Sequence, residues 1–407
     1  MPLNSLFIDF NAYFASVEQQ LRPELRGRPV GVVPVVTETT CCIAASYEAK
    51  HFGVKTGTLV AEAKRLCPEI QLVHARHEEY IKYHHLLVET VESCVPVQQV
   101  CSIDEMVCEL TGSQQRREVA LDLTQRIKQT IAREAGSELR CSIGIAPNHY
   151  IAKTATDMQK PDGCVVIEDG DLPECLFPLA LRDLCGIGAA MERRLHRRGI
   201  HTVEQLCAAS KALLHNAWNG IEGERMYARL RGELVYSPPT QRSSVGHSHV
   251  LPPDLRNESA AYSVLHKLLQ KAAVRLRAYE YLAGGMVVHV RYKNGLHWKE
   301  ALAFDFTNDT IMLLKVLALI WAKRMQTKSM PIAVAVSLFR LQEVKGSTLS
   351  LFENEAAREK LNSALDRINA RYGKNAIYFG GAHHALNAAP MRIAFTHIPD
   401  ITLEGDE

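Results

Sequence analysis

The sequence of residues 5–21, SLFIDFNAYFASVEQQL, joins a short apolar run, an aspartate and a helical pattern. The run Ser5–Ile8 predicts a buried strand with Asp9 at its carboxyl end. Within Asn11–Leu21, Phe14 and the apolar residues three and seven positions later fall on one face of a helix. This stretch therefore predicts a strand that carries a carboxylate to the edge of a sheet, directly before a helix that covers it.

A second pair of carboxylates, Asp104 and Glu105, separates two apolar segments. Val100–Ile103 precedes the pair and alternating apolar residues in Met106–Leu110 follow it, so the pair is expected at the bend of a β-hairpin. Carboxylates at strand ends of one sheet match a two-metal phosphoryl-transfer site, because neighbouring divalent cations need shared anionic ligands. Strand-end acids also cap turns or face water, and the pattern alone favours that interpretation.

The segments around these acids predict an α/β domain. A helix from Pro147 to about Gln159 buries one apolar face, and Lys153 and Lys160, seven residues apart, point together from another face. A compact insert between residues 29 and 73 interrupts the domain. The remaining elements predicted for the domain are a helix over Ser113–Ala135 and strands over Arg140–Ala146 and Cys164–Ile167.

The second half of the chain predicts different secondary structure from the first half. Residues 171–237 predict short helices with tight turns, and Pro238–Ser244 has the composition of a linker, because prolines and small polar residues resist helix and sheet. The segments that follow have the order βαββαβ, which predicts one compact α+β domain. They are strand 245–250, helix 258–279, strands 286–292 and 298–304, helix 309–325 and strand 332–341, followed by a tail helix at 356–370.

Composition places the 407-residue chain among folded proteins with several cores, since 47% of its residues are hydrophobic and 23% charged. No apolar stretch reaches the roughly 18 residues that cross a bilayer, and no signal-peptide pattern opens the chain, so a cytosolic protein without membrane contact is expected. The cysteines and histidines show no zinc-like spacing. Acidic residues outnumber basic ones in residues 1–179 and the reverse holds in residues 240–345, which fits a metal-dependent site that handles a polyanion.

Five motifs together resemble those of the Y-family DNA polymerases, the translesion enzymes. Ile8–Glu18 and Ser102–Glu105 resemble the two metal-binding motifs of that family. Tyr47–Lys55 resembles its fingers, Lys153–Gly163 the end of its palm, and Gly186–Gly188 its thumb. The resemblance covers essentially the whole chain in the family's order of domains, and it favours metal binding over turn capping for the acids.

The resemblance implies an α/β and α+β multidomain protein with the right-hand polymerase fold: palm, small fingers, helical thumb and βαββαβ little finger. Because every part of the chain is assigned, no separate proofreading exonuclease remains and low fidelity is expected. The expected boundaries are 1–24 and 75–170 for the palm with the catalytic carboxylates, 25–74 for the fingers, 171–237 for the thumb with a helix-hairpin-helix, 238–246 for a linker, 247–345 for the little finger, and 346–407 for a clamp-binding motif and the C-terminal tail.

The resemblance also implies roles for single residues. Asp9, the Phe10 carbonyl and Asp104 are expected to bind two Mg²⁺ ions together with Glu105, the third catalytic carboxylate. Phe14 falls at the steric-gate position, where a ring excludes a ribose 2′-hydroxyl, although its place on the apolar helix face also fits ordinary core packing. The residues expected to bind the incoming nucleotide besides Phe14 are Tyr47, Lys50 and Lys160.

The sequence departs from the DinB-type branch of the family at three positions. Asn11 stands in place of an acid, Ala44 in place of a threonine and Lys50 in place of an arginine. These residues resemble the UmuC-type branch, whereas Tyr47 and the short fingers remain closer to DinB, so the chain mixes features of both. Lysine supplies a point charge without the bidentate fork of arginine, so an altered nucleotide grip is expected at Lys50.

Two further motifs concern macromolecular partners. Gly186 and Gly188, before a basic helix, resemble a helix-hairpin-helix in which backbone N–H groups hold a DNA phosphate, although a lone Gly-x-Gly is more often a bare turn. Thr348–Phe352 resembles the bacterial sliding-clamp-binding peptide. The expected clamp contacts are Leu349, Leu351 and Phe352.

Together these motifs predict a cytoplasmic, error-prone translesion DNA polymerase of DNA repair and the SOS response, which extends primer-template DNA with deoxynucleoside triphosphates. A sliding clamp and UmuD-like or RecA-like proteins are the further partners considered. One alternative is a catalytically silent adaptor that binds DNA and the clamp, but such family members lose the carboxylates that this chain retains. A metal nuclease is the other alternative, and it explains neither Phe14 nor the lysines of the nucleotide site.

Overall fold

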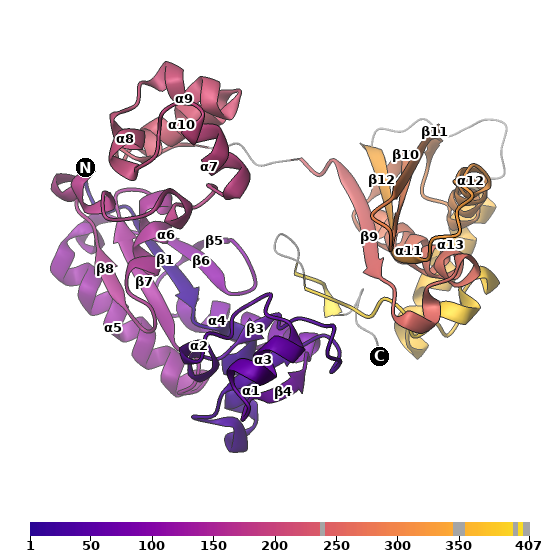
Figure 1. The fold of residues 1–407 in the computed structure, drawn as a ribbon, viewed down its shortest axis with the longest axis horizontal. Helices are drawn as coiled ribbons and strands as arrows, with labels where there is room; N and C mark the ends of the chain where they lie inside the picture. Colours follow the sequence, from indigo (N-terminus) through magenta and orange to yellow (C-terminus); the bar gives the residue numbers. More distant parts are fainter. Residues whose placement is uncertain (237–240, 345–354, 394–397, 402–407) are drawn as a thin grey trace. The chain divides into compact units, whose positions relative to one another are not determined.

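The computed structural model describes the chain apart from residues 237–240, 345–354, 394–397 and 402–407. The chain forms two compact units, residues 1–237 with 393–398 and residues 238–392 with 399–407 (Figure 1). Each unit surrounds apolar cores of its own. Among the described residues, no helix is both long and apolar enough to cross a lipid bilayer.

The first unit is built around a sheet of five strands. In spatial order these are β5 (Val97–Val100), β6 (Glu105–Glu109), β1 (Ser5–Phe10), β7 (Cys141–Ala146) and β8 (Cys164–Val166). The central strand β1 pairs antiparallel with both β6 and β7. Successive residues of a strand alternate between faces, so Phe7 and Asp9 share one face of β1 and Leu6 and Ile8 the other.

Three longer helices accompany this sheet: α4 (His77–Glu92), α5 (Arg117–Glu134) and α6 (His149–Met158). Helix α6 packs on β1 and β7, and it lies on the face of Phe7, because Phe7 and Ile151 share one apolar core. The Asn148 side chain caps α6 by accepting a hydrogen bond from the Ile151 amide at 2.8 Å. The cap fixes the start of α6 and so the position of Lys153 on it.

Helix α1 (Tyr13–Leu21) begins two residues later than the sequence pattern suggests. Ala12 has a φ of 50°, in the left-handed region, so the chain turns sharply between β1 and α1. Asn11 consequently lies in the turn, where its side-chain amide donates to Ser142 Oγ at 3.1 Å and its Oδ1 accepts from the Asp162 amide at 2.7 Å. The polar side chain of Asn11 therefore ties three segments of the first unit together.

The start of α5 also differs from the expectation of a helix from Ser113. A short 3₁₀ turn occupies Gly112–Gln115, and α5 begins only at Arg117. Thr111 and Gln114 form a capping box that satisfies the turn's own amides. Arg116, between the turn and α5, has an extended backbone (φ −82°, ψ 136°), so the turn does not continue into α5.

A smaller three-stranded sheet forms the insert that corresponds to the expected fingers. Its strands in spatial order are β3 (Ala44–Ala45), β2 (Val30–Val33) and β4 (Gln71–His74), with helices α2 (Tyr47–His51) and α3 (Val60–Leu66). The insert has its own small core, which includes Val33, Ala49 and Ala63. Ser46 Oγ accepts from the amides of Val30 and Ala49 at 3.0 and 3.3 Å, so it ties α2 to β2.

Four short helices complete the first unit and gather at one end of it (Figure 1). They are α7 (Ala189–His196), α8 (Val203–Ala208), α9 (Lys211–Trp218) and α10 (Ile221–Arg229). Their core is continuous with that of α6. The Asn148 amide donates to the carbonyls of Arg229 and Glu233 at 2.9 and 3.0 Å, which joins these helices to the start of α6.

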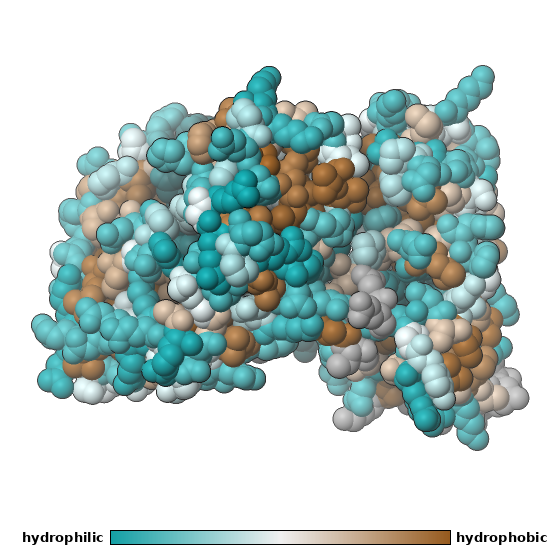
Figure 2. Space-filling model, turned by 90° about the horizontal axis from the view of Figure 1, so that it is seen from below, coloured by the Kyte–Doolittle hydropathy of each residue, from teal (hydrophilic) through white to brown (hydrophobic). Residues whose placement is uncertain are grey.

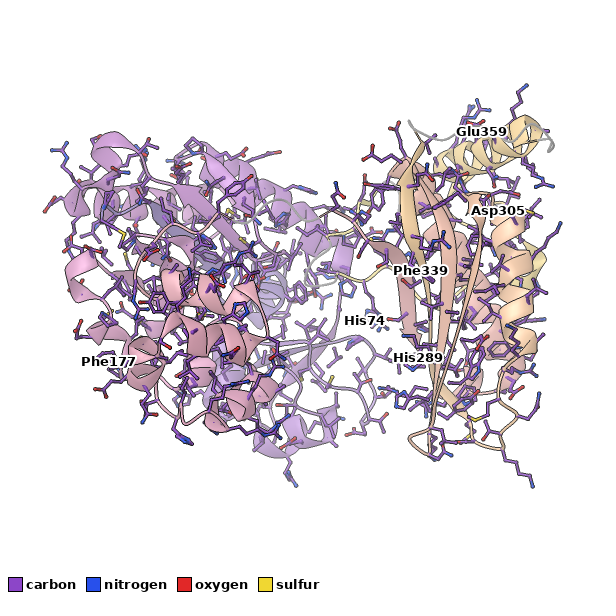
Figure 3. The ribbon with its side chains drawn as sticks, turned by 90° about the horizontal axis from the view of Figure 1, so that it is seen from above. His74, Phe177, His289, Asp305, Phe339 and Glu359 are labelled. Atoms are coloured by element: carbon purple, nitrogen blue, oxygen red, sulfur yellow. The ribbon has the colours of Figure 1, made fainter. Side chains whose placement is uncertain are left out.

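The second unit has the expected order βαββαβ, confirmed by a four-stranded sheet with two helices between its strands. In spatial order the strands are β11 (His297–Thr307), β10 (Tyr281–Tyr292), β12 (Pro331–Glu343) and β9 (Ser244–Val250), and the helices are α11 (Glu258–Ala278) and α12 (Thr310–Ala322). Val288 and Val290 pack into the core beneath the helices. His289 and Phe339 alternate with core residues and lie on the other face (Figure 3).

The tail helix α13 (Glu355–Tyr372) belongs to the fold of the second unit. Arg277 on α11 makes a bidentate ion pair with Asp366 on α13, with N–O distances of 2.7 and 2.8 Å. Asn362 donates to Asp309 Oδ1 at 2.9 Å at the start of α12.

Figure 2 shows hydrophilic residues over most of the visible face, with apolar patches between them.

Candidate active site

Strands β1 and β6 bring Asp9 and Glu105 opposite each other at one end of the five-stranded sheet. The two residues are register partners in the antiparallel pair. The Phe10 amide donates to the Asp104 carbonyl at 2.9 Å, so the bend between β5 and β6 is held against the end of β1. Residues far apart in the sequence are thereby brought together as a set of three carboxylates.

Asp104 is held in a defined orientation just before β6. The Ser102 hydroxyl donates to Asp104 Oδ1 at 2.7 Å. Burial raises the pKa of the Asp104 carboxyl, and the negative charges of Asp9 and Glu105 raise it further, against the lowering effect of the Ser102 hydrogen bond. A cation close to Asp104 would offset this repulsion between negative charges.

Two lysines supply positive charge to this set. The Lys153 ammonium lies 2.5 Å from Asp9 Oδ2 and 2.6 Å from Glu105 Oε1, and the Lys160 ammonium lies 2.8 Å from Asp9 Oδ1 and 2.8 Å from Asp157 Oδ1. Both oxygens of Asp9 are therefore paired. The sequence pattern placed Lys160 on the same helix face as Lys153, but α6 ends at Met158 and Lys160 lies beyond it. The Lys160 ammonium still contacts the same aspartate, Asp9.

The surroundings of both lysines keep them charged. Burial lowers the pKa of Lys153, but the charges and hydrogen bonds of Asp9 and Glu105 outweigh burial and leave the pKa well above its usual value. The pKa of Lys160 is raised by Asp9 and Asp157 in the same way, against burial. Both side chains are thus ammonium ions that neutralise part of the carboxylate charge.

The donor set fits a hard divalent cation in its chemistry, because Asp9, Asp104 and Glu105 offer carboxylate oxygens. The Phe10 side chain is a hydrocarbon ring without a donor atom, so only its main-chain carbonyl can join the set. The Lys153 ammonium, between two of the carboxylates, is a stand-in that marks where a cation is held. Within residues 1–236, 241–344, 355–393 and 398–401, no three His, Cys, Asp or Glu side chains are placed so that they could already hold a metal ion.

Phe14 is the second residue of α1 and is partly exposed. Its ring stacks on Tyr80, with centroids 4.4 Å apart, and meets the ring of His77 edge-on at 6.2 Å. Tyr80 is itself fully buried on α4. Phe14 is therefore not ordinary core, because one side packs against a rigid wall while the other remains accessible.

Tyr47 and Lys50 lie on α2, the short helix that Ser46 caps. The Lys50 ammonium lies 4.2 Å from the centre of the Tyr47 ring, a cation–π contact. Burial lowers the pKa of Lys50 and the positive charge of Lys160 lowers it further, while burial raises the pKa of Tyr47 against the influence of Lys160. Lys160 thus acts on both residues, and these three of the four side chains expected at the nucleotide share one electrostatic environment with Asp9.

Comparisons with known proteins place the chain in a family. The impB/mucB/samB family matches residues 8–157, and the C-terminal domain of the same family matches residues 242–351. DNA polymerase IV of Moorella thermoacetica is 34% identical over 383 residues, which span 92% of this chain and 94% of that protein. The chain belongs to this family, the Y-family of DNA polymerases. DNA polymerase IV 1 of Bacillus subtilis is 29% identical over 392 residues, 92% of this chain and 91% of that protein.

Solved structures share the fold of this Y-family polymerase. A Y-family DNA polymerase chimera of Dbh and Dpo4 superposes with a TM-score of 0.70 and 22% identity, over 83% of this chain and 99% of that one. DinB from Sulfolobus solfataricus superposes with a TM-score of 0.53 over 83% of this chain and 98% of its own. These likenesses confirm the right-hand polymerase fold that the motifs predicted. As a Y-family member, the chain is a DNA-directed DNA polymerase for translesion synthesis that depends on divalent metal.

The two glycines expected at DNA directly precede helix α7 of this Y-family polymerase. Gly186 has a φ of 83°, which glycine adopts without strain, and Gly188 is the N-cap of α7. Ile187 between them is buried, so the turn is anchored in the core of the four short helices. The residues expected at the sliding clamp, Thr348–Phe352, lie outside the described residues.

Four residues that support the site of this polymerase were not predicted from the sequence. Glu18 is fully buried and accepts hydrogen bonds from Arg76 at 3.1 and 2.6 Å and from the Tyr80 hydroxyl at 2.8 Å. The Tyr13 hydroxyl donates to the Tyr80 carbonyl at 2.6 Å. The one signal in the sequence was an acid on the inner side of α1, but nothing local indicated its partners on α4.

Proposed function

We propose that Asp9, Asp104 and Glu105 form the catalytic centre at which this polymerase adds deoxynucleotides opposite damaged template bases. The observation that carries the proposal is the register pairing of Asp9 with Glu105, with the ammonium groups of Lys153 and Lys160 beside them. Such a site joins an anionic set suited to metal with cations suited to a polyphosphate, which is what nucleotidyl transfer requires.

The reaction is the attack of a primer 3′-oxygen on the α-phosphorus of a deoxynucleoside triphosphate, which forms a phosphodiester bond and releases pyrophosphate. Two Mg²⁺ ions, held by Asp9, Asp104 and the Phe10 carbonyl with Glu105 completing the set, would lower the pKa of the 3′-hydroxyl and stabilise the leaving group. The protein itself contributes by holding the carboxylates in position. The β1–β6 pairing and the Ser102 hydrogen bond fix the carboxylates before substrate arrives.

The triphosphate is assigned to Lys160, Lys50 and Tyr47. The charge of Lys160 reaches both finger residues, which supports a common binding region for the phosphates. Two cations and a hydroxyl there would stabilise the negative charge that develops on the phosphates during transfer. Phe14 is assigned to the sugar of the same nucleotide, where its ring would exclude a 2′-hydroxyl by contact.

DNA and accessory partners involve other parts of the chain. The backbone amides near Gly186 and Gly188 would hold a primer-template phosphate, and the basic residues of the little finger would follow the duplex backbone with affinity that falls steeply with salt. Leu349, Leu351 and Phe352 are assigned to a sliding clamp. UmuD-like or RecA-like partners, the SOS response, mutagenesis and a cytoplasmic location belong to the same proposal, on the strength of the sequence motifs.

Extension of a labelled primer on an undamaged template, with single nucleotides, tests the catalytic assignment. The intact protein should extend with Mg²⁺ and stop when EDTA removes it, and Asp104→Ala should lose at least about a thousandfold in rate. Asp122→Ala, which removes an exposed carboxylate of α5, is the matched control and should extend normally. Extension by Asp104→Ala at the control rate would contradict the assignment, and no extension by the intact protein would favour the adaptor.

A further inference from the structure

We propose that Lys153 is an internal counter-ion that holds the place of a metal ion between Asp9 and Glu105 and must leave it when a divalent cation binds. The inference rests on the proposed metal site and adds a regulatory step to it. Its basis is geometric: one ammonium group contacts both carboxylates, at 2.5 and 2.6 Å, with Asp157 Oδ2 a further 3.8 Å away.

The position of Lys153 is built into the fold. Helix α6 is fixed by the Asn148 cap and by its packing on β1 and β7, so the lysine backbone is held against the sheet that carries Asp9. The Lys153 side chain is 16% exposed, and its ammonium lies 5.4 Å from the centre of the Phe7 ring. Its long stem can swing while α6 stays in place, so an exchange with metal needs no change of fold.

The need for such a counter-ion follows from the charge of the site. Asp9 and Asp104 are buried or nearly so beside Glu105, and like charges brought together away from water are costly unless a cation accompanies them. Lys160 also contacts Asp9, but its other partner is Asp157 rather than Glu105. Among the ion pairs of the described residues, only that of Lys153 bridges two of the three carboxylates of the site.

The exchange has a consequence for substrate binding. A divalent cation that binds Asp9 and Glu105 has to break both Lys153 contacts, so its affinity is lowered by the strength of those contacts. A nucleotide polyphosphate offers the released ammonium a new anionic partner. Metal and nucleotide should therefore strengthen each other's binding through Lys153, in addition to their direct contact.

Binding of Mn²⁺ to the whole protein without DNA or nucleotide tests the inference, measured by the loss of the free Mn²⁺ electron-spin signal. Lys153→Gln should bind Mn²⁺ about five- to fiftyfold more tightly than the intact protein. It should also melt at a lower temperature without metal and gain more from added Mn²⁺. Lys128→Gln is the matched control, because Lys128 is 23% exposed in the same domain and pairs with Asp162, away from the three carboxylates.

The possible outcomes separate the two claims. Equal or weaker Mn²⁺ binding by Lys153→Gln would overturn the inference while leaving the metal site intact. No Mn²⁺ binding by the intact protein would instead remove the proposed site itself. If Lys153→Gln folds only when Mn²⁺ is present, the inference is supported. If Lys153→Gln folds neither with nor without Mn²⁺, the test uses Lys153→Arg instead. Arginine keeps the positive charge, so this variant should not bind Mn²⁺ more tightly than the intact protein. Tighter binding would overturn the inference.

Discussion

The rings of Phe14 and Tyr80 are stacked, with centroids 4.4 Å apart and planes inclined by 14°. Tyr80 has little freedom to move, because its hydroxyl donates to the buried Glu18 and its carbonyl accepts from Tyr13. Helix α4 therefore supplies a fixed wall on which one side of the Phe14 ring packs, and this contact orients the ring. The sugar gate proposed at Phe14 would therefore consist of two stacked rings held by the hydrogen bonds of Tyr80, rather than of one aromatic side chain.

Phe14→Ala should relax the choice between deoxyribonucleotides and ribonucleotides. Removing the ring opens the space that a 2′-hydroxyl needs, so the relative kcat/KM for ribonucleotides should rise about ten- to a hundredfold. Single-nucleotide insertion with matched pairs such as dCTP and CTP measures the ratio. Phe52→Ala, at an exposed ring beyond α2, is the control and should leave the ratio unchanged. An unchanged ratio for Phe14→Ala would assign Phe14 to packing alone.

Glu18→Gln should destabilise the first unit and loosen the gate. The neutral amide leaves Arg76 without its bidentate partner and weakens the hold on Tyr80, so unfolding should become easier by about 2 to 4 kcal/mol. Urea unfolding followed by far-ultraviolet circular dichroism measures the change. Glu79→Gln, which breaks a surface pair with Lys82 on the same helix α4, should change stability by less than about 0.5 kcal/mol. Equal changes in the free energy of unfolding for the two variants would show that the buried Glu18 network stabilises the unit no more than a surface ion pair does.

Lys50→Arg should strengthen nucleotide binding. Arginine keeps its charge, whereas burial and Lys160 lower the pKa of Lys50, and its planar fork can hold a phosphate with two hydrogen bonds. The KM for a correct deoxynucleotide should fall about three- to tenfold with little change in kcat. Lys55→Arg, an exposed lysine of the same insert, should leave KM unchanged. A KM that rises in Lys50→Arg would mean that the pocket is shaped for lysine.

The second unit should lose stability as pH falls, because His249 is buried as a neutral ring. Burial and the charges of Arg392, Lys267 and Lys271 lower its pKa to about 4, and its Nε2 accepts from the Ala389 amide at 3.3 Å. An unfolded histidine titrates near pH 6.5, so between about pH 6.5 and 4 the unfolded chain binds an additional proton. Stability conferred by the neutral ring is therefore full above pH 6.5 and declines on acidification.

The loss should approach about 2 to 3 kcal/mol at pH 4. Hydrogen exchange of the β9 and β12 amides, corrected for intrinsic rates, follows this unit within the whole chain. The glutamine of His249→Gln can still accept a hydrogen bond from the Ala389 amide but cannot titrate. The protection of the β9 and β12 amides against exchange should therefore depend less on pH in this variant. Parallel pH profiles for the two proteins would rule out His249 as the cause.

Much of the fold is predictable because it depends on local patterns. The apolar run before Asp9 and the alternation after Glu105 each reflect a strand with one buried face, and the βαββαβ order of the second unit follows from the same periodicities. The start of α1 is different. An alanine carries no signal for the left-handed turn that Ala12 makes, so the two-residue error arises from tertiary contacts of Asn11.

Only those residues of the site that lie in short sequence motifs are predictable from the sequence. The carboxylates sit in short motifs at strand ends, and the structure brings them together. The pairing of Lys153 with Asp9 and Glu105 has no such signal, because it depends on how α6 crosses the sheet. The Glu18–Arg76 pair likewise joins residues 58 positions apart, and a charged residue on an inner helix face indicates a buried partner without saying which.

Insertion of a single nucleotide opposite an abasic template site, by the intact protein and by Asp9→Asn in parallel, tests the central claim most directly. Asparagine keeps the shape of Asp9 but removes the charge that pairs with Lys153 and Lys160 and that the proposed metal site requires. The intact protein should insert and then extend beyond the site with Mg²⁺, and Asp9→Asn should be slower by at least about a thousandfold. An intact protein that stops before the abasic site, or an Asp9→Asn protein that passes it at a comparable rate, would contradict a translesion polymerase built on this carboxylate.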